Sequence, residues 1–386
     1  MINVSIVGAG QTKFGRHTEY DLRELFALAA NDAVAEAGIT TKGVQALFVG
    51  NLSADLFNRQ CHIAPLVADF AGMKGIAATR CEAACASSAT ALRAAILALE
   101  SGLYDVVIAG GVEKMTDLPT AGVVETLAMA ADQTFEASAG LTFPGIFAVM
   151  AVAHMQKFGT TREQLAAVAV KNHHNAVNNP LAQFQQEVTV DKVLSSRMVA
   201  WPLGLFDCSP ISDGAAAVVL VRTKDARRYT DAPVKIIGSA QASGSMNLCD
   251  RENLHTLQAA KQASAEAYKQ TKLDAKDIDF AEVHDCFTIA EIIATEDLGF
   301  FKPGEGGPAV EQGRTQIGAE KPINTSGGLK AKGHPVGATG VAQVIELYHQ
   351  LRNEAGKRQV PDADVGLTHN VGGTGATCCI HICKRW

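Results

Sequence analysis

VSIVGAGQ at residues 4–11 recurs as VKIIGSAQ at residues 234–241. Both are runs of β-branched residues interrupted by glycine, which is the pattern of a buried strand. Internal similarity at a fixed separation indicates that a chain holds copies of one structural unit. The two segments therefore predict a duplicated chain in which each half opens with a strand.

A second pair of segments follows in the same order. ITTKGV at residues 39–44 leads into the strand pattern at 46–49, and LDAKDI at residues 273–278 leads into the strand pattern at 280–283. Each pair reads as a loop that feeds a buried strand.

A third match aligns Cys85 with His334, so that Ala89-Thr90 falls on Ala338-Thr339, and each of these pairs is predicted to begin a helix. A strand pattern follows each helix. Two α/β units with a mostly parallel, buried sheet in each half are the expected fold class.

Sites in such sheets form at the carboxyl ends of strands. Five polar residues stand at or just past predicted strand ends or at the following helix starts: Asn51, Cys85, His284, His334 and Asn370. Two related halves would bring these positions to one shared cleft.

A segment of different character, rich in methionine and in helical patterns, separates the halves. One helix in it should begin with a capping box at Thr160 and Glu163 and stop before Asn179-Pro180, and His173-His174 on that helix should be solvated. We interpret the segment as a lid over the cleft, although its methionines could equally fill a core. The predicted division is residues 1–112 and 204–228 for the N-terminal half, 113–203 for the lid, and 229–386 for the C-terminal half.

The composition excludes several classes of protein. The 386 residues are 47% hydrophobic and 19% charged, which is typical of a globular enzyme. A net charge of −6 without a basic run argues against nucleic-acid binding. No segment approaches the roughly 18 apolar residues of a membrane span, and the first residues lack a signal-peptide pattern. Nine cysteines without a secretion signal are expected to be thiols in the cytoplasm.

Cys85 lies in EAACASSA, residues 82–89, directly before a predicted helix. A helix N-terminus favours a thiolate, and small neighbours let a substrate approach while the Cys85 N–H points at a developing oxyanion. A buried structural cysteine would fit the same segment. His334, between Gly333 and Pro335, is the duplication's counterpart of Cys85, and a neutral histidine near a thiol is the usual means of activating it.

Two more segments end predicted strands. HDCF at residues 284–287 could present His284 and Cys286 to one pocket, but two candidate ligands without a second pair are a weak metal signal. HNVGGTG at residues 369–375 has glycines that allow close approach and could offer N–H groups to an oxyanion.

These segments together resemble the thiolase superfamily along essentially the whole chain. The resemblance rests on the Cys85 segment and on four further motifs: SPISDGAA at 209–216, HDCF at 284–287, GHP at 333–335 and NVGG at 370–373. It implies a five-layer αβαβα fold of two related halves with an inserted loop domain, a homodimer or a dimer of dimers, and acyl transfer through the cysteine.

One departure from the common thiolase pattern is informative. Asn370 occupies the position of the usual second cysteine, and HDCF replaces the usual Asn-Glu-Ala-Phe. The chain thus resembles the sterol-carrier-protein type and its archaeal acetoacetyl-CoA thiolase relatives, in which Cys286 would be the acid/base. Those relatives assemble with 3-hydroxy-3-methylglutaryl-CoA synthase through an OB-fold protein that carries a zinc ribbon, so these are the expected partners.

By this resemblance Cys85 carries the acyl group and His334 activates it. Cys286, through a lowered pKa, removes a proton from C2 of the second substrate, and His284 with His334 binds the enolate oxygen. The Cys85 and Gly372 N–H groups would hold the tetrahedral oxyanion, and Ser209 the pantetheine arm. Coenzyme A thioesters are the expected substrates, with no metal and no permanently bound cofactor.

Four alternatives remain open from the sequence. A decarboxylating condensing enzyme would use Cys85, His284 and His334 without a carbon base, so Cys286 distinguishes it. The others are an acyltransferase subunit of a multiprotein complex, a non-enzymatic thiolase-like scaffold, and a degradative thiolase for longer, branched or aromatic 3-oxoacyl-CoA.

Overall fold

A computed structural model describes residues 2–386, so Met1, the first residue of the predicted N-terminal half, lies outside the described part. Nine strands form one sheet in the order β3-β2-β4-β7-β1-β8-β11-β10-β9. The strands are β1 (Val4–Gln11), β2 (Ala46–Gly50), β3 (Ala77–Cys81), β4 (Val106–Glu113), β7 (Gly214–Arg222), β8 (Val234–Ser243), β9 (Phe280–Glu282), β10 (Val365–Gly372) and β11 (Thr377–Arg385). A separate hairpin pairs β5 (Met198–Ala200) with β6 (Leu203–Gly204).

The duplication is visible in this strand order. β1 and β8, which carry the repeated octapeptide, meet in the middle of the sheet through antiparallel pairing of Val4–Ile6 with Val234–Ile236. From this junction the order runs β7-β4-β2 on one side and β11-β10-β9 on the other, so corresponding strands hold corresponding places. The two copies predicted from the sequence are therefore two halves related by an approximate twofold axis.

The expectation of mostly parallel sheets is wrong. Only β2 with β3, β2 with β4, and β9 with β10 run parallel, and the other neighbours in the large sheet are antiparallel. The reason lies in the connections: β11 follows β10 through a short glycine-rich turn, and a hairpin of this kind forces antiparallel pairing.

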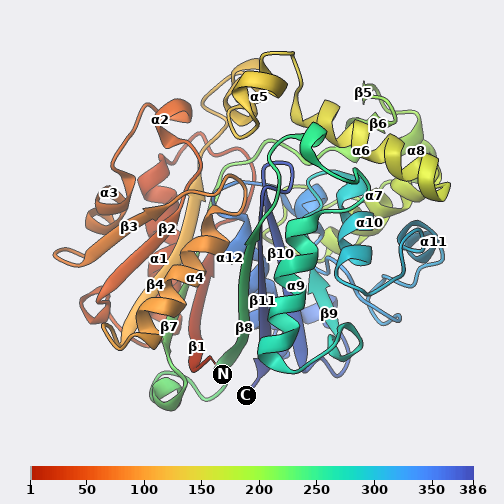
Figure 1. Cartoon of the computed structure of the whole chain (residues 1–386). Coiled ribbons are helices and arrows are strands. Elements are labelled where there is room, and N and C mark those ends of the chain that lie inside the picture. Colours follow the sequence, from red (N-terminus) through yellow and green to blue (C-terminus); the bar gives the residue numbers. More distant parts are fainter. Residues whose placement is uncertain (1) are drawn as a thin grey trace.

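The N-terminal and C-terminal halves of the large sheet each form one layer, and the helices form three more layers around them (Figure 1). α4 (Ser87–Glu100) and α12 (Thr339–Leu351) pack together in the centre, where they share one apolar cluster with strands of both halves. α1 (Leu22–Glu36) covers the outer face of the N-terminal half, and α9 (Gln258–Thr271) covers that of the C-terminal half. The result is the five-layer αβαβα arrangement.

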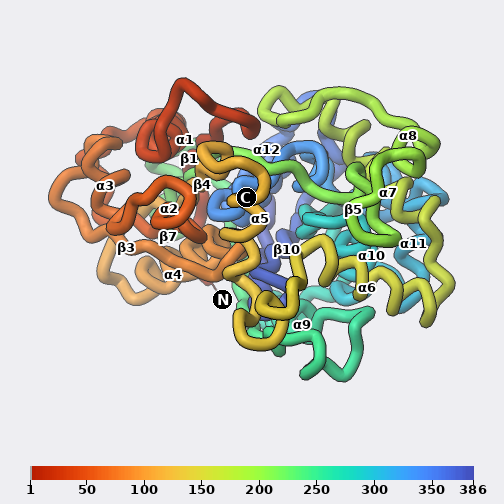
Figure 2. The backbone as a smooth tube through the Cα atoms, turned by 90° about the horizontal axis from the view of Figure 1, so that it is seen from above, coloured from red at the N-terminus to blue at the C-terminus, as the bar shows by residue number. Residues whose placement is uncertain are grey.

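The remaining helices lie at the periphery or in the segment between the halves, except α10 (Thr288–Asp297), which is almost wholly buried in the C-terminal half. The others are α2 (Ala54–Phe57), α3 (Ile63–Phe70), α5 (Thr120–Ala128), α6 (Phe143–Phe158), α7 (Arg162–Val177), α8 (Val190–Leu194) and α11 (Gly306–Glu311). In Figure 2, seen from above, the yellow and green segment that holds α5 to α8 crosses the face at which the two halves meet. No helix among residues 2–386 is long and apolar enough to cross a membrane.

The intervening segment contributes to the core, and its role as a lid stays a prediction. Met150 and Phe147 of α6 are buried in the apolar cluster of the C-terminal half, whereas Met129 and Met198 are exposed. The core interpretation therefore holds for Met150. The boundaries at residues 113 and 203 remain a prediction.

The predicted capping box of α7 is displaced by one residue. Thr161 is the N-cap and forms the box with Gln164, while the Thr160 hydroxyl lies 2.7 Å from His154 Nδ1 in a buried contact. The end of the helix before Asn179 is confirmed. Of the adjacent histidines predicted to be solvated, His174 is exposed but His173 is buried, because this face of α7 packs against the rest of the protein.

Candidate active site

Cys85 stands in a tight turn between β3 and α4. The preceding residue, Ala84, has a φ of 50°, in the left-handed region that residues other than glycine rarely adopt. The Ser87 hydroxyl accepts from Ala83 N (3.0 Å) and donates to Ala84 O (2.6 Å), which fixes the turn. α4 begins at Ser87, two residues earlier than predicted, so Cys85 lies just before the first helical turn.

His334 is held by an equally constrained backbone. Gly333 has a φ of 115°, and a Cβ there would lie 2.9 Å from Phe14 Cβ, so this position requires glycine. The His334 N–H donates to Ser212 Oγ at 2.9 Å. α12 begins at Thr339 as predicted.

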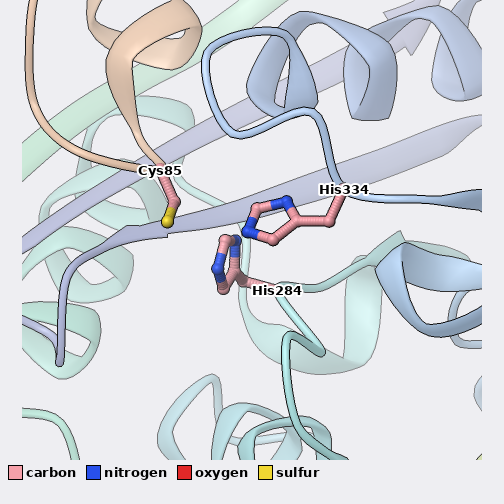
Figure 3. A group of neighbouring side chains, drawn as sticks. All are labelled: Cys85, His284 and His334. Carbon is pink, nitrogen blue, oxygen red and sulfur yellow. The ribbon is translucent and has the colours of Figure 1, made fainter. Parts of the chain in front are cut away.

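The two halves bring three of the predicted residues together. Cys85 Sγ and one ring nitrogen from each of His284 and His334 all lie within 4.8 Å of one another. The rings meet edge to face, with centroids 5.1 Å apart at 82°. Figure 3 shows Cys85 entering from one half and the two histidines from the other. Cys286 is outside this group of donor atoms, although its thiol is close enough for the charge of Cys85 to raise its pKa.

Hydrogen bonds assign the tautomer of each histidine. His334 Nδ1 lies 2.7 Å from Thr339 Oγ1, and that hydroxyl donates its own proton to Pro335 O at 3.0 Å. His334 Nδ1 must therefore carry the proton, which leaves a lone pair on its Nε2. His284 Nδ1 accepts from Asn370 Nδ2 at 3.0 Å, so its proton is on Nε2. The site thus pairs one proton acceptor with one hydrogen-bond donor.

Burial keeps the resting groups neutral. Part of Cys85 is exposed, but the dense protein around it raises the pKa of its thiol to about 12, with the Glu113 charge adding to the rise. Burial also raises the pKa of Cys286 well above its usual value, which corrects the expectation that the environment lowers it. It lowers the pKa of His334 to about 3 and that of His284 well below its ordinary value.

The segment after β9 is anchored by Asp285. Its carboxylate accepts from Leu329 N (2.7 Å), Lys330 N (3.2 Å) and Asn172 Nδ2 (2.8 Å). Burial raises the pKa of Asp285 to about 7. Asp285 is thereby bonded both to the segment that precedes His334 and to helix α7. These bonds fix the directions of the neighbouring side chains, His284 and Cys286.

Sequence reasoning missed the polar residues behind the site. Asn324 and Asn172 both donate to Glu291 Oε2, and Lys171 Nζ forms an ion pair with that carboxylate at 2.8 Å. Glu113, at the end of β4, accepts from Asn51 Nδ2 (2.8 Å) and from Leu52 N (2.7 Å). No local motif marks these residues, because their roles come from partners far away in sequence.

The other predicted residues lie near the cluster. Ser209 N donates to Cys286 O at 2.9 Å, which ties the SPISDG segment to the HDCF segment. Burial raises the pKa of the Cys85 thiol, and the backbone N–H groups of Gly373 and of Cys85 itself oppose that rise, while the oxyanion role of Gly372 stays a prediction. Gly372 permits close packing, since a Cβ there would overlap Ala83 O.

Comparison with known proteins gives consistent results. Residues 4–224 match the family model described as thiolase, N-terminal domain, and residues 240–385 match the thiolase C-terminal domain-like model. An acetyl-CoA acetyltransferase of Methanothermobacter thermautotrophicus is 53% identical over 100% of both chains. Sterol carrier protein 2 of Bos taurus is 36% identical over 97% of this chain and 70% of that protein. A solved structure described as Ltp2-ChsH2(DUF35) aldolase superposes with a TM-score of 0.86 at 26% identity, covering 98% of this chain and 97% of that one.

Proposed function

The chain belongs to the thiolase family and is a thiolase-type acyltransferase, and from this premise we propose that it condenses two molecules of acetyl-CoA through an acetyl group carried on Cys85. The arrangement of Cys85, His334 and His284 carries the proposal, because it supplies a nucleophile, a proton acceptor and a hydrogen-bond donor within 4.8 Å. The alternatives of a longer acyl substrate or a condensing subunit are not favoured by the similarity to acetyl-CoA acetyltransferases.

Acylation begins with the neutral groups of the resting site. The Cys85 proton moves to the lone pair of His334 Nε2, and the sulfur attacks the thioester carbon of acetyl-CoA. The oxyanion that forms accepts from the N–H groups of Cys85 and Gly372. When the carbon–sulfur bond to coenzyme A breaks, Cys286 gives its proton to the departing sulfur. His334 is then protonated, Cys286 is a thiolate, and Cys85 is acetylated.

Carbon–carbon bond formation uses the charges left by the first step. The Cys286 thiolate removes a proton from C2 of a second acetyl-CoA, while His284 Nε2–H donates to the enolate oxygen. The C2 carbanion attacks the acetyl carbon on Cys85. The Cys85 sulfur departs and recovers the proton from His334, so both thiols and both imidazoles return to their neutral states. The raised pKa of Cys286 agrees with its being a thiol at rest and a strong base once ionised.

A comparison of two half-reactions tests this assignment. We expect acetyl-CoA alone to add one acetyl group to Cys85, detected by peptide mass spectrometry, and to yield acetoacetyl-CoA with free coenzyme A. Cys286→Ser should lower acetoacetyl-CoA formation by about 100-fold or more, within the range seen for loss of a general base. Cys208→Ser, which changes a half-buried thiol in place of the buried Cys286, is the control and should remain active.

The assignment fails if Cys286→Ser condenses acetyl-CoA at the native rate. Retained condensation of a malonyl thioester by that variant, with none of acetyl-CoA by the native protein, would support the decarboxylating alternative.

The proposal also covers the cellular compartment, the oligomeric state and the partner proteins. We propose that the protein acts in the cytoplasm, where a reducing environment preserves the nine free cysteines. We also propose a homodimer or a dimer of dimers, and an OB-fold zinc-ribbon partner that joins the protein to 3-hydroxy-3-methylglutaryl-CoA synthase. The similar structure whose description names a DUF35 component supports a partner protein, and isoprenoid or lipid metabolism would be the setting. Size-exclusion chromatography with light scattering, with and without such partners, tests these points.

A further inference from the structure

The site holds one sulfur and two imidazole nitrogens that the sequence analysis grouped for catalysis but did not consider as metal ligands. The metal signal was weak when only His284 and Cys286 were considered, because two candidate ligands had no second pair. The structure replaces Cys286 with Cys85 and His334, and brings the Cys85 sulfur and one ring nitrogen of each histidine within 4.8 Å of one another. One sulfur and two imidazole nitrogens are the donor set that Zn²⁺ and similar ions prefer.

The distances are close to those of a tetrahedral zinc site. Zinc–sulfur bonds of about 2.3 Å and zinc–nitrogen bonds of about 2.0 Å place neighbouring ligand atoms about 3.3 to 3.5 Å apart. The donor atoms must therefore draw together by about 1.5 Å at most, which side-chain rotations can achieve. Three protein ligands leave a fourth position open for water.

The hydrogen bonds behind the histidines match the requirements of metal ligands. His334 already donates from Nδ1 to Thr339, so its Nε2 lone pair is available to a metal without rearrangement. His284 Nε2 is buried and has no hydrogen-bond partner among the described residues. Figure 3 shows both rings turned toward the Cys85 sulfur.

Asn370 allows His284 to change tautomer. It now donates its amide Nδ2 to His284 Nδ1, while its own Oδ1 is buried and has no partner within residues 2–386. If the amide turns over, Oδ1 can accept a proton from Nδ1, and the proton leaves Nε2. Asn370 would then support a metal-bound His284 in the way that a second ligand shell commonly does.

We propose that Cys85, His284 and His334 form a binding site for a thiophilic divalent cation such as Zn²⁺, and that its occupation reversibly inhibits the protein. One zinc–sulfur and two zinc–nitrogen bonds form, and the Cys85 thiol proton passes to solvent. Neither the cysteine nor the metal changes oxidation state. The bound cation blocks acyl transfer because it occupies both the sulfur and the His334 lone pair. Metal binding depends on the resting side chains and does not require the proposed condensation.

Cobalt absorption tests the site directly. Co²⁺ added to the purified protein should give a thiolate-to-metal charge-transfer band and the visible bands of a tetrahedral ion, and Zn²⁺ should abolish both. Cys85→Ser should remove the charge-transfer band. His284→Asn and His334→Asn should weaken binding by more than the roughly 10- to 100-fold that loss of a second-shell partner causes. Asn370→Ala should fall within that second-shell range, and Asn370→Asp should bind more tightly, because a carboxylate supports a metal-bound histidine better than an amide does.

Controls separate this site from the exposed thiols. Cys61→Ser and Cys249→Ser remove the two exposed cysteines and should leave the cobalt spectrum unchanged. Alkylation of Cys85 with iodoacetamide should prevent binding, and circular dichroism shows whether each variant is folded. A charge-transfer band that survives in Cys85→Ser, or its absence in the native protein, would overturn the proposal.

The inhibition is measured separately from binding. Micromolar Zn²⁺ should stop thiolytic cleavage of acetoacetyl-CoA, a chelator should restore it, and Mg²⁺ should have no effect because it prefers oxygen ligands. Cobalt binding without thiolase activity would contradict the proposed function and leave the site intact. Full activity in the presence of saturating Zn²⁺ would refute the inhibitory role.

Discussion

Replacing Thr339 with valine should disable the proton acceptor of the nucleophile while preserving the shape of the site. The Thr339 hydroxyl accepts from His334 Nδ1 at 2.7 Å and donates to Pro335 O at 3.0 Å. Pro335 O also receives the backbone N–H groups of Ala338 (2.9 Å) and Thr339 (3.1 Å), so it stays satisfied in the variant. In the variant, His334 Nδ1–H is therefore the only one of these groups that loses its hydrogen-bond partner.

The size of the effect on acylation follows from the His334 Nδ1–H group, which is left without an acceptor. A buried donor without an acceptor costs about 1 to 3 kcal/mol. The ring can avoid this cost only by moving its proton to Nε2, where it can no longer accept the proton of Cys85. Since about 1.4 kcal/mol corresponds to a factor of ten, acylation of Cys85 should slow by about 10- to 100-fold. KM for acetyl-CoA should change little, because Thr339 is placed behind the histidine and away from the substrate.

Rapid-quench mass spectrometry of the acetylated Cys85 peptide measures this rate. Thr339→Ser retains the hydroxyl and is the matched control, expected within about threefold of the native rate; thermal unfolding of both variants checks that the fold is preserved. Native-like acylation by Thr339→Val would refute the tautomer assignment and with it the role of His334 as proton acceptor.

Two other changes test the framework and its pH dependence. Gly328 has a φ of 58°, and a Cβ there would overlap the Asp285 carboxylate, so Gly328→Ala should destabilise the protein by about 2 kcal/mol or more. Gly140 also has a positive φ (84°) but faces open space, so Gly140→Ala should cost about 1 kcal/mol. Urea unfolding measures both losses, and equal losses would contradict the proposed role of Asp285 in holding this segment. Burial lowers the pKa of His381 from 6.5 to about 4, so the unfolded chain binds a proton at this histidine more tightly than the folded protein does. The free energy of unfolding therefore decreases as the pH falls from 6.5 toward 4. Between about pH 7.5 and 5.5 the free energy of unfolding of the native protein should therefore fall by about 1.4 kcal/mol more than that of His381→Gln. If the two proteins lose the same stability over this range, His381 does not titrate as a buried group.

The sequence by itself determined the duplicated architecture and predicted Cys85, His284 and His334, which the structure brings together. Strand patterns and internal repeats depend on local side-chain periodicity, and β1 with β8 and β2 with β9 occupy the corresponding places that the repeats predicted. Cys85 and His334 could be paired because the duplication gave them equivalent positions in the two halves. The thiolase motifs then predicted the family.

Only the tertiary structure decided how the sheet runs and what state the site is in. Strand direction depends on connections, so the hairpin between β10 and β11 overrode the expected parallel pairing. The raised pKa of Cys286 results from burial by residues distant in sequence, which a local motif does not report. The same holds for the tautomers of His334 and His284, which are set by Thr339 and Asn370. Periodicity and motif are short-range properties of the chain, whereas burial and hydrogen-bond partners arise only when its two halves pack together.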